Sequence, residues 1–390
     1  MKYDFDTVYN RKDTNSVKYK IHPRYPGIND LIPMWIADMD FKTAPEIVSA
    51  LKGAADEGIF GYTELDGEYF DLLIEWNKKR FDFNVQREWI VPCEGVMFAI
   101  AATIRALSDV GDSVLILQPV YYPFANVIND NNRRLVVSEL LSDEKRYTID
   151  YEDVERKIID NNVKLLLFCS PHNPVCRVWD KEEILRIAEI CKKHRVIVIS
   201  DEIHSDLVYK SHYPTASLSD EIAQNTVAVT SVTKTFNLAG IKGANLIIPN
   251  ISIRNIIKKE MKAVYSGGLE IMSSTATKAA YRYGEPWLSE LIECLKDNID
   301  FVINSFENTK ISVIPPEGTY LLWLDCRALN MCEKELEEFF IRDCGVWMNS
   351  GYIFGKGGNG FMRMNIACPR KTLEEAVFRI KNKLKEKNDE

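Results

Sequence analysis

Residues Val196-Ile197-Val198-Ile199-Ser200-Asp201-Glu202 join an apolar run of strand length to a pair of acidic residues. A short, unbroken β-branched run predicts a strand that is buried on both faces of a parallel sheet. A carboxylate at the end of such a strand is costly to bury unless it meets a cation, so Asp201 needs a positively charged partner. Either a structural salt bridge or a cationic ligand would meet this need.

Similar runs recur along the chain, and amphipathic stretches of helical period separate most of them. They lie at residues 113–117, 134–137, 164–169, 226–230 and 245–248. This alternation predicts an α/β fold with a mostly parallel sheet covered on both faces, and it places functional groups at the carboxyl ends of the strands. After residue 285 the pattern changes to a long helical segment followed by short strands and helices. We therefore expect an N-terminal segment at residues 1–45, a large domain at 46–285 and a small α+β domain at 286–390.

The composition excludes several classes of function. The 390 residues carry 49 basic and 57 acidic side chains, a formal charge of −8, without a segregated basic face, which argues against nucleic-acid binding. No apolar window has the length of a membrane span, and the acidic start of the chain is unlike a secretory signal. The nine cysteines include no CxxC pair and the five histidines show no ligand spacing. We therefore expect a cytoplasmic protein with reduced thiols, no metal and no membrane contact.

Three more segments carry reactive side chains. Ser170-Pro171-His172-Asn173-Pro174 follows a predicted strand, and its prolines hold the Asn173 amide in a rigid loop. Lys234 lies in a hydroxyl-rich turn after another predicted strand, where loss of water can make the amine nucleophilic. Arg363 lies in an apolar run, where a fixed guanidinium can clamp a carboxylate. An ordinary turn, a solvated lysine and a structural ion pair are the respective alternatives for each segment taken alone.

Together these groups suit one ligand that offers an aldehyde, a ring-nitrogen cation and a phosphate, with a partner that bears a carboxylate. Pyridoxal 5′-phosphate with an amino acid has these groups. The intervals between Asn173, Asp201, Lys234 and Arg363, of 28, 33 and 129 residues, resemble those of fold-type I enzymes of the aspartate aminotransferase superfamily. Within that superfamily the chain is similar to the MalY/PatB-type carbon–sulfur lyases, which include cystathionine β-lyases and cysteine desulfhydrases. The similar segments are residues 34–41, 60–62, 170–174, 177–179, 201–204, 234–239 and 364–370.

The resemblance implies a mostly parallel seven-stranded sheet and a role for each matching residue. Lys234 would bond the aldehyde of the cofactor and later act as the general base at the substrate Cα. Asp201 would pair with the pyridinium nitrogen, Asn173 would hydrogen-bond the 3′ oxygen, and Tyr121 would stack on the ring. Lys234, Tyr121 and Tyr62 are the residues that we expect to be catalytic.

The same resemblance implies a phosphate site and a neighbouring subunit. The groups implied for the phosphate are the amides at the start of a predicted helix, from Gly95, Val96 and Met97, and the hydroxyls of Ser231 and Thr233. Tyr62 would reach the phosphate bound by the neighbouring subunit, which implies a homodimer with a shared active site. Arg363 would bind the substrate carboxylate, with Ala37 and Asn173 beside it.

Three features depart from the pattern of the family or need a separate interpretation. Cys176 stands where the family usually has glycine, and a left-handed turn there would store strain on the order of 1 kcal/mol. Lys242 stands where many relatives of the aminotransferase type place an arginine that clamps the phosphate, so it is either a phosphate ligand or a surface lysine. The glycine-rich residues 355–360 lack the Lys-Ser/Thr ending of a P-loop, and we expect a mobile turn there.

The expected function is a β-elimination that converts cystathionine or a cysteine-type amino acid into pyruvate, ammonia and a thiol. An aminotransferase is the alternative, because both reactions use the same cofactor residues. A non-catalytic regulatory protein on the same fold is a third possibility, but it predicts damage to the set of reactive residues, and that set is complete.

Overall fold

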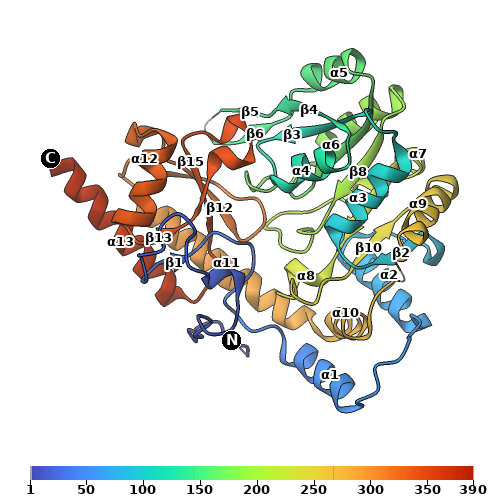
Figure 1. Cartoon of the computed structure of the whole chain (residues 1–390), viewed down its shortest axis with the longest axis horizontal. Helices are drawn as coiled ribbons and strands as arrows, with labels where there is room; N and C mark the ends of the chain where they lie inside the picture. The colour runs from blue at the N-terminus through green and yellow to red at the C-terminus, as the bar shows by residue number, and fades with distance from the viewer. Residues whose placement is uncertain (1, 144, 267, 390) are drawn as a thin grey trace.

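A seven-stranded sheet forms the centre of the larger of two lobes in the computed structural model, which describes residues 2–143, 145–266 and 268–389, with side chains as far as residue 387 (Figure 1). In order across the sheet, the strands are β2 (Ile90–Cys93), β10 (Ala244–Ile247), β9 (Thr226–Thr230), β8 (Ile197–Asp201), β7 (Val163–Cys169), β3 (Ser113–Gln118) and β4 (Arg134–Glu139). Strand β10 is antiparallel to both neighbours and the other neighbouring pairs are parallel. The expected mostly parallel seven-stranded sheet is confirmed. Residue 1, which begins the first expected segment, and residue 390, which ends the last one, lie outside the described residues.

The sequence runs identified six of these seven strands and missed β2. This strand is four residues long and contains Pro92, which reads as a strand breaker. In the fold β2 pairs only with β10, at the edge of the sheet, where the missing N–H of a proline is tolerated. The position of this strand therefore depends on a tertiary pairing that the local sequence does not signal.

Helices cover both faces of the large sheet because its strands are apolar on both sides. Val114 and Ile116 pack with α3, α4 and α9, whereas Leu115 and Leu117 pack on the opposite face with α5 and α6. The helices of this lobe are α1 (Pro45–Asp56), α2 (Gly67–Phe81), α3 (Val96–Leu107), α4 (Pro123–Asp130), α5 (Tyr151–Asp160), α6 (Lys181–Lys193), α7 (Asp220–Ala223), α8 (Val232–Thr235), α9 (Ile251–Ala263) and α10 (Ile271–Tyr283).

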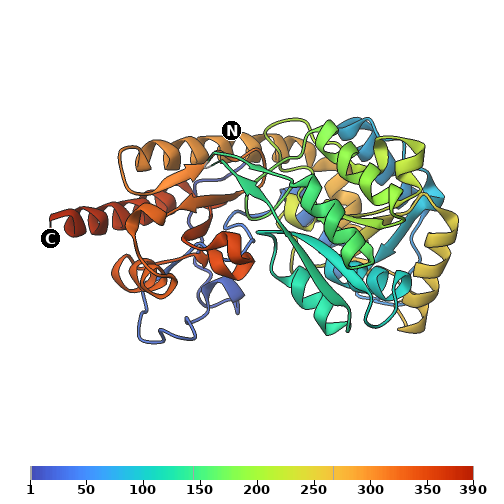
Figure 2. The ribbon, with the colours of Figure 1, turned by 90° about the horizontal axis from the view of Figure 1, so that it is seen from above.

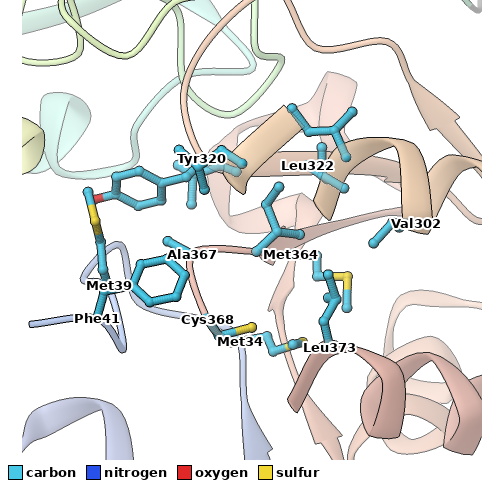
Figure 3. Packing of buried hydrophobic residues seen from close by; sticks show 14 of the residues in the cluster. Met34, Met39, Phe41, Val302, Tyr320, Leu322, Met364, Ala367, Cys368 and Leu373 are labelled. Atoms are coloured by element: carbon cyan, nitrogen blue, oxygen red, sulfur yellow. The ribbon is translucent and has the colours of Figure 1, made fainter. Parts of the chain in front are cut away.

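The smaller lobe is built on a four-stranded antiparallel sheet in the order β11 (Ser312–Ile314), β12 (Leu321–Asp325), β15 (Phe361–Asn365) and β14 (Asn349–Ser350). Helix α11 (Glu285–Phe306) runs from the larger lobe to the smaller one (Figures 1 and 2), where it packs with α13 (Arg370–Asp389). Part of the core between these elements is drawn in Figure 3. Helix α12 (Glu333–Glu338) is followed by one π-helical turn (Phe339–Asp343).

Short elements complete the structure. Strand β1 (Ile32–Pro33) pairs in parallel with β13 (Val346–Trp347), so the N-terminal segment is bound to the smaller lobe, and β5 (Leu141–Ser142) pairs with β6 (Tyr147–Thr148). The 3₁₀ turns are Val17–Tyr19, Arg87–Trp89, Thr215–Ser217, Arg327–Leu329, Gly351–Phe354 and Lys356–Gly358. Among the described residues, no helix combines the length and the apolar character that crossing a membrane requires.

The glycine-rich residues 355–360 contain a 3₁₀ turn in which Lys356, Gly357 and Asn359 are exposed, and the mobility expected there stays a prediction, although some of the glycines make close contacts. A Cβ atom on Gly351 would lie 2.0 Å from the carbonyl oxygen of Gly358, and one on Gly355 would lie 2.5 Å from the side chain of Gln118. The amide of Val120 also donates to the carbonyl of Phe354 at 2.9 Å. Glycines are needed here because they let backbone segments approach within contact distance, directly before the strand that carries Arg363.

We predict that Gly351→Ala lowers the free energy of unfolding by about 1–3 kcal/mol, because the added methyl group has no space. Urea unfolding followed by circular dichroism measures the change. Gly27→Ala is the matched control: a Cβ there meets nothing within 4 Å, so its effect stays within about 0.5 kcal/mol. Equal stability of the two variants would contradict the packing.

Candidate active site

A pocket lies at the carboxyl ends of the central parallel strands and is closed by strand β15 and the irregular segment 35–37. Eight of the residues predicted from the sequence line it: Ala37, Val96, Met97, Tyr121, Asn173, Asp201, Lys234 and Arg363. The parallel strands bring most of them together because the loops that follow leave the sheet at the same edge, whereas Arg363 comes from the small antiparallel sheet and Ala37 from the N-terminal segment. Asn173, Asp201, Lys234 and Arg363 are separated by 28, 33 and 129 positions in the sequence, yet all four line one cavity.

Lys234 lies in the short helix α8, between the two lobes (Figure 1), and Ser231 caps the start of that helix. The Lys234 Nζ atom donates a hydrogen bond to the carbonyl oxygen of Ala37 at 2.5 Å. Burial lowers the pKa of Lys234 to about 8, and the positive charge of Arg363 acts in the same direction. A larger fraction of the amine is therefore neutral and nucleophilic at physiological pH than for a lysine in water.

Asp201 ends strand β8 with only 4% of its surface exposed. Its Oδ1 atom accepts a hydrogen bond from the amide of Ile203 at 3.1 Å. Within the described residues no basic side chain lies within 4 Å of this carboxylate, so the structural salt bridge that the sequence left open is not formed. Burial raises the pKa of Asp201 to about 7. The carboxylate is thus suited to a ligand that carries a cation or a transferable proton.

Arg363 lies in β15 and is 3% exposed. Its guanidinium donates to Asn173 Oδ1 at 3.0 Å, to Asn349 Oδ1 at 2.6 Å and to the carbonyl of Trp35 at 2.7 Å, and Nε has no partner among the described residues. These acceptors are neutral, and burial lowers the pKa of Arg363 to about 10. A buried guanidinium without a carboxylate partner is a site for a carboxylate ligand.

Asn173 and Tyr121 both line the pocket. Because the Asn173 oxygen accepts from Arg363, the amide hydrogens of Asn173 are left to donate to a ligand. Burial raises the pKa of Tyr121 to about 12, which keeps its hydroxyl protonated, and its ring packs edge-on against Phe124 with 5.9 Å between centroids. One residue thus offers a hydrogen-bond donor and the other an aromatic face.

The predicted anion site is the N-terminus of α3, where Val96 and Met97 line the pocket. Gly95 is the N-cap, and because glycine has no side chain, it leaves the first-turn amides open to a ligand. Ser231 Oγ donates to the carbonyl of Gly243 at 2.7 Å and pairs with the Thr233 hydroxyl at 2.8 Å. These hydroxyls are buried beside Lys234 rather than on the lining of the pocket, and their contact with a phosphate stays a prediction.

Tyr62 and Lys242 lie outside this pocket. Tyr62 is fully exposed in the loop before α2, so it does not serve the site of its own chain. Lys242 is exposed and has a left-handed backbone with φ of 62°. Cys176 has φ of 60°, as the replacement of a glycine suggested, and its buried thiol donates to the carbonyl of Leu321 at 2.6 Å.

Several lining residues were missed from the sequence: Trp35, Ile36, Tyr122, Cys169, Ile203, His204 and Asn349. His204 could have been found from the sequence, since it belongs to the segment 201–204 that is similar to the lyases. Burial lowers the pKa of His204 to about 3, so its ring is neutral. Asn349 could not have been found, because it reaches the pocket only through the pairing of β14 with β15 opposite Arg363.

The mostly parallel sheet, with a lysine, a carboxylate and an arginine at its carboxyl edge, has the architecture of the fold-type I transferases. The chain belongs to the aminotransferase class I and II family, whose model matches residues 29–380.

Two curated relatives match nearly the whole chain. It is 38% identical to cystathionine β-lyase PatB of Bacillus subtilis, over 97% of this chain and 99% of that protein. It is 32% identical to protein MalY of Escherichia coli, over 98% of this chain and 99% of that protein.

Two solved structures agree with this relationship. Cystalysin from Treponema denticola, which contains pyridoxal 5′-phosphate, superposes with a TM-score of 0.96 and 38% identity, covering 99% of this chain and 100% of that one. The PLP-bound C–S lyase from Staphylococcus hominis superposes with a TM-score of 0.90 and 32% identity, covering 98% of both chains.

We predict that acylation of Lys234 by acetic anhydride in the cofactor-free chain rises with pH and is half-maximal near pH 8. The sign follows from the lowered pKa: the reactive neutral amine predominates above pH 8, whereas surface lysines continue to gain reactivity up to about pH 10.4. Mass spectrometry of the peptides measures both groups in one sample. A Lys234 profile that follows that of the surface lysines would contradict the assignment.

Proposed function

We propose that this protein is a pyridoxal 5′-phosphate-dependent carbon–sulfur β-lyase that acts on cystathionine and cysteine-type amino acids. The observation that carries the proposal is one pocket in which Asp201, Lys234 and Arg363 meet without ion-pair partners among the described residues. The products are pyruvate, ammonia and a thiol. The relatives named as cystathionine β-lyase and C–S lyase support this reaction over amino-group transfer.

The pocket fits the cofactor group by group. Asp201 supplies the countercharge for a protonated ring nitrogen, the Asn173 amide can donate to the 3′ oxygen, and the Tyr121 ring offers a stacking face. The first-turn amides of α3 suit the phosphate, with Ser231, Thr233 and Lys242 as further proposed ligands. When bound, the cofactor supplies an electron-withdrawing ring next to the substrate Cα.

The side chains of the protein perform the remaining steps. Arg363 binds the α-carboxylate of the substrate in two-point geometry, and the backbone at Ala37 lies on the same side of the pocket. Lys234 Nζ takes the proton from Cα, a transfer that its lowered pKa favours. The bond between Cβ and sulfur then breaks, and the electron pair leaves with the thiolate, which takes up a proton to become the thiol. Water hydrolyses the remaining enamine of the amino acid to pyruvate and ammonia.

The proposal includes a second copy of the chain and a cytoplasmic location. The loop before α2 exposes Ile59 by 80%, Phe60 by 62% and all of Tyr62, an apolar surface that suits a homodimer. In such a dimer Tyr62 would complete the phosphate site of the partner. We also propose the division into an N-terminal segment, a large domain and a small domain at residues 45/46 and 285/286, supported by the separate sheets of the two lobes.

Incubation of the purified chain and pyridoxal phosphate with cystathionine tests the function. Pyruvate, measured by coupled reduction, and free thiol, measured with a chromogenic disulfide, are expected in equal amounts. Lys234→Ala is the matched control and is expected to lose both products, together with the borohydride-fixed bond between lysine and cofactor.

Absence of pyruvate and thiol, with efficient amino transfer to a 2-oxoacid, would instead establish an aminotransferase. Neither reaction, with the lysine bond formed, would favour the regulatory alternative.

We predict that Asp201→Asn lowers turnover by about 10²–10³-fold without destabilising the cofactor-free chain. Because the pKa of Asp201 is raised in the folded chain, the wild type loses stability as pH rises from about 4, where an unfolded aspartate ionises, to about 7, where the buried one ionises. The variant is therefore expected to be more stable by about 1–3 kcal/mol at pH 8 and equal at pH 4. Urea unfolding at the two pH values and the pyruvate assay measure these effects. Wild-type turnover would show that the acid is structural.

A further inference from the structure

The segment that closes the pocket, residues 34–41, has neither helical nor strand structure. Buried backbone of this kind must find hydrogen-bond partners outside regular ladders. Here side chains from distant parts of the chain supply them: Arg363 donates to Trp35, Lys18 to Asp38, and Asn237 to Met39 and Phe41. The position of this segment is thus set by these side-chain donors together with backbone hydrogen bonds, such as those from the Met34 amide to Trp347 and from the Asp40 amide to Ala367.

Asn365 holds the backbone on both sides of Ala37. Its Nδ2 atom donates to the carbonyl of Ile36 and to the carbonyl of Asp38, each at 2.6 Å. Its own oxygen accepts from the amide of Ala367 at 2.8 Å, which fixes the side chain. The Ala37 peptide therefore cannot follow Lys234 when that lysine moves.

The Ala37 carbonyl oxygen accepts two hydrogen bonds, one from Lys234 Nζ at 2.5 Å and one from the Tyr320 hydroxyl at 3.0 Å. Tyr320 is 1% exposed and precedes strand β12, and its ring extends toward the segment that carries Met39 and Phe41 (Figure 3). The ring also lies edge-on to His204, with 6.1 Å between centroids, so it cannot swing freely.

Two donors on one acceptor have a consequence for the lysine. The proposed function requires the Lys234 amine to leave Ala37 and react, and without another donor the departure would leave a part-buried carbonyl without a protein partner. Tyr320 remains as a donor after the lysine has left. It also shares the acceptor beforehand, which weakens the hold of the carbonyl on the charged amine.

We propose that Tyr320 is a positioning residue that keeps the Ala37 carbonyl hydrogen-bonded and so frees the Lys234 amine to react. The proposal rests on the proposed function, because it assigns a purpose to the release of Lys234. The groups that act on the lysine charge from the other elements are Arg363, Asp38 and Asp201, and a change at Tyr320 leaves all three in place.

The test is Tyr320→Phe, which removes one hydroxyl and keeps the ring. In the cofactor-free full chain, the pH profile of Lys234 acetylation is expected to move upward, because the carbonyl then binds the protonated amine more strongly. The acetylation rate at pH 7 is expected to fall about three- to tenfold, which corresponds to a shift of half a pKa unit to one unit. The matched control is Tyr69→Phe, which removes a buried hydroxyl that donates to Asn245 Oδ1 at 2.9 Å, and its Lys234 profile is expected to equal that of the wild type.

A folded Tyr320→Phe chain with the wild-type profile would overturn the proposal, even if its melting temperature falls, because a purely structural role predicts that outcome. Should the variant not fold, a crystal structure of the wild type with pyridoxal phosphate bound decides instead. The Tyr320 hydroxyl is expected to stay within 3.2 Å of the Ala37 oxygen after Lys234 has left, and a hydroxyl turned away would overturn the proposal. The labelling does not require turnover, so failure of the lyase assay is a separate result.

Discussion

Three charged side chains, Lys234, Asp201 and Arg363, are withdrawn from water in one pocket without an ion-pair partner among the described residues. Desolvation of this kind is unfavourable, and it shifts each pKa toward the neutral form. The rest of the structure holds these groups in place against that cost. The two cores on either face of the large sheet fix the strand ends, and the smaller lobe holds the arginine in a strand paired on both sides.

The irregular segment 34–41 connects these charges to the remainder of the fold. Its carbonyls accept from Arg363 and Lys234, which the proposed chemistry needs, and from Asn365, Asn237 and Tyr320, which do not react themselves. The segment can therefore lose the first group of donors and keep its shape through the second. This division gives the pocket a stable wall while its reactive groups change partners.

Much of the site could be predicted from local patterns. Asp201, Asn173 and Lys234 each follow an apolar run of strand length, and the geometry of parallel sheets brings such positions together. Strand β2 was missed because a proline at a sheet edge has the same local pattern as a loop. Tyr320 and Asn349 were also missed, because their importance lies in contacts with residues 283 and 14 positions away. The close contacts of Gly355 and Gly358 were not predicted, because close packing of backbone on backbone leaves no apolar signal.

By itself the sequence determined the fold class and the family and predicted the reactive side chains, since apolar periodicity and motifs can be recognised along the chain without its fold. Only the tertiary structure decided that Asp201 and Arg363 have no salt-bridge partner among the described residues, that Lys234 shares the Ala37 carbonyl with Tyr320, and that Tyr62 is exposed outside the pocket of its own chain. The physical reason is that desolvation and hydrogen-bond satisfaction depend on which distant atoms surround a group, and only the packed chain sets those surroundings.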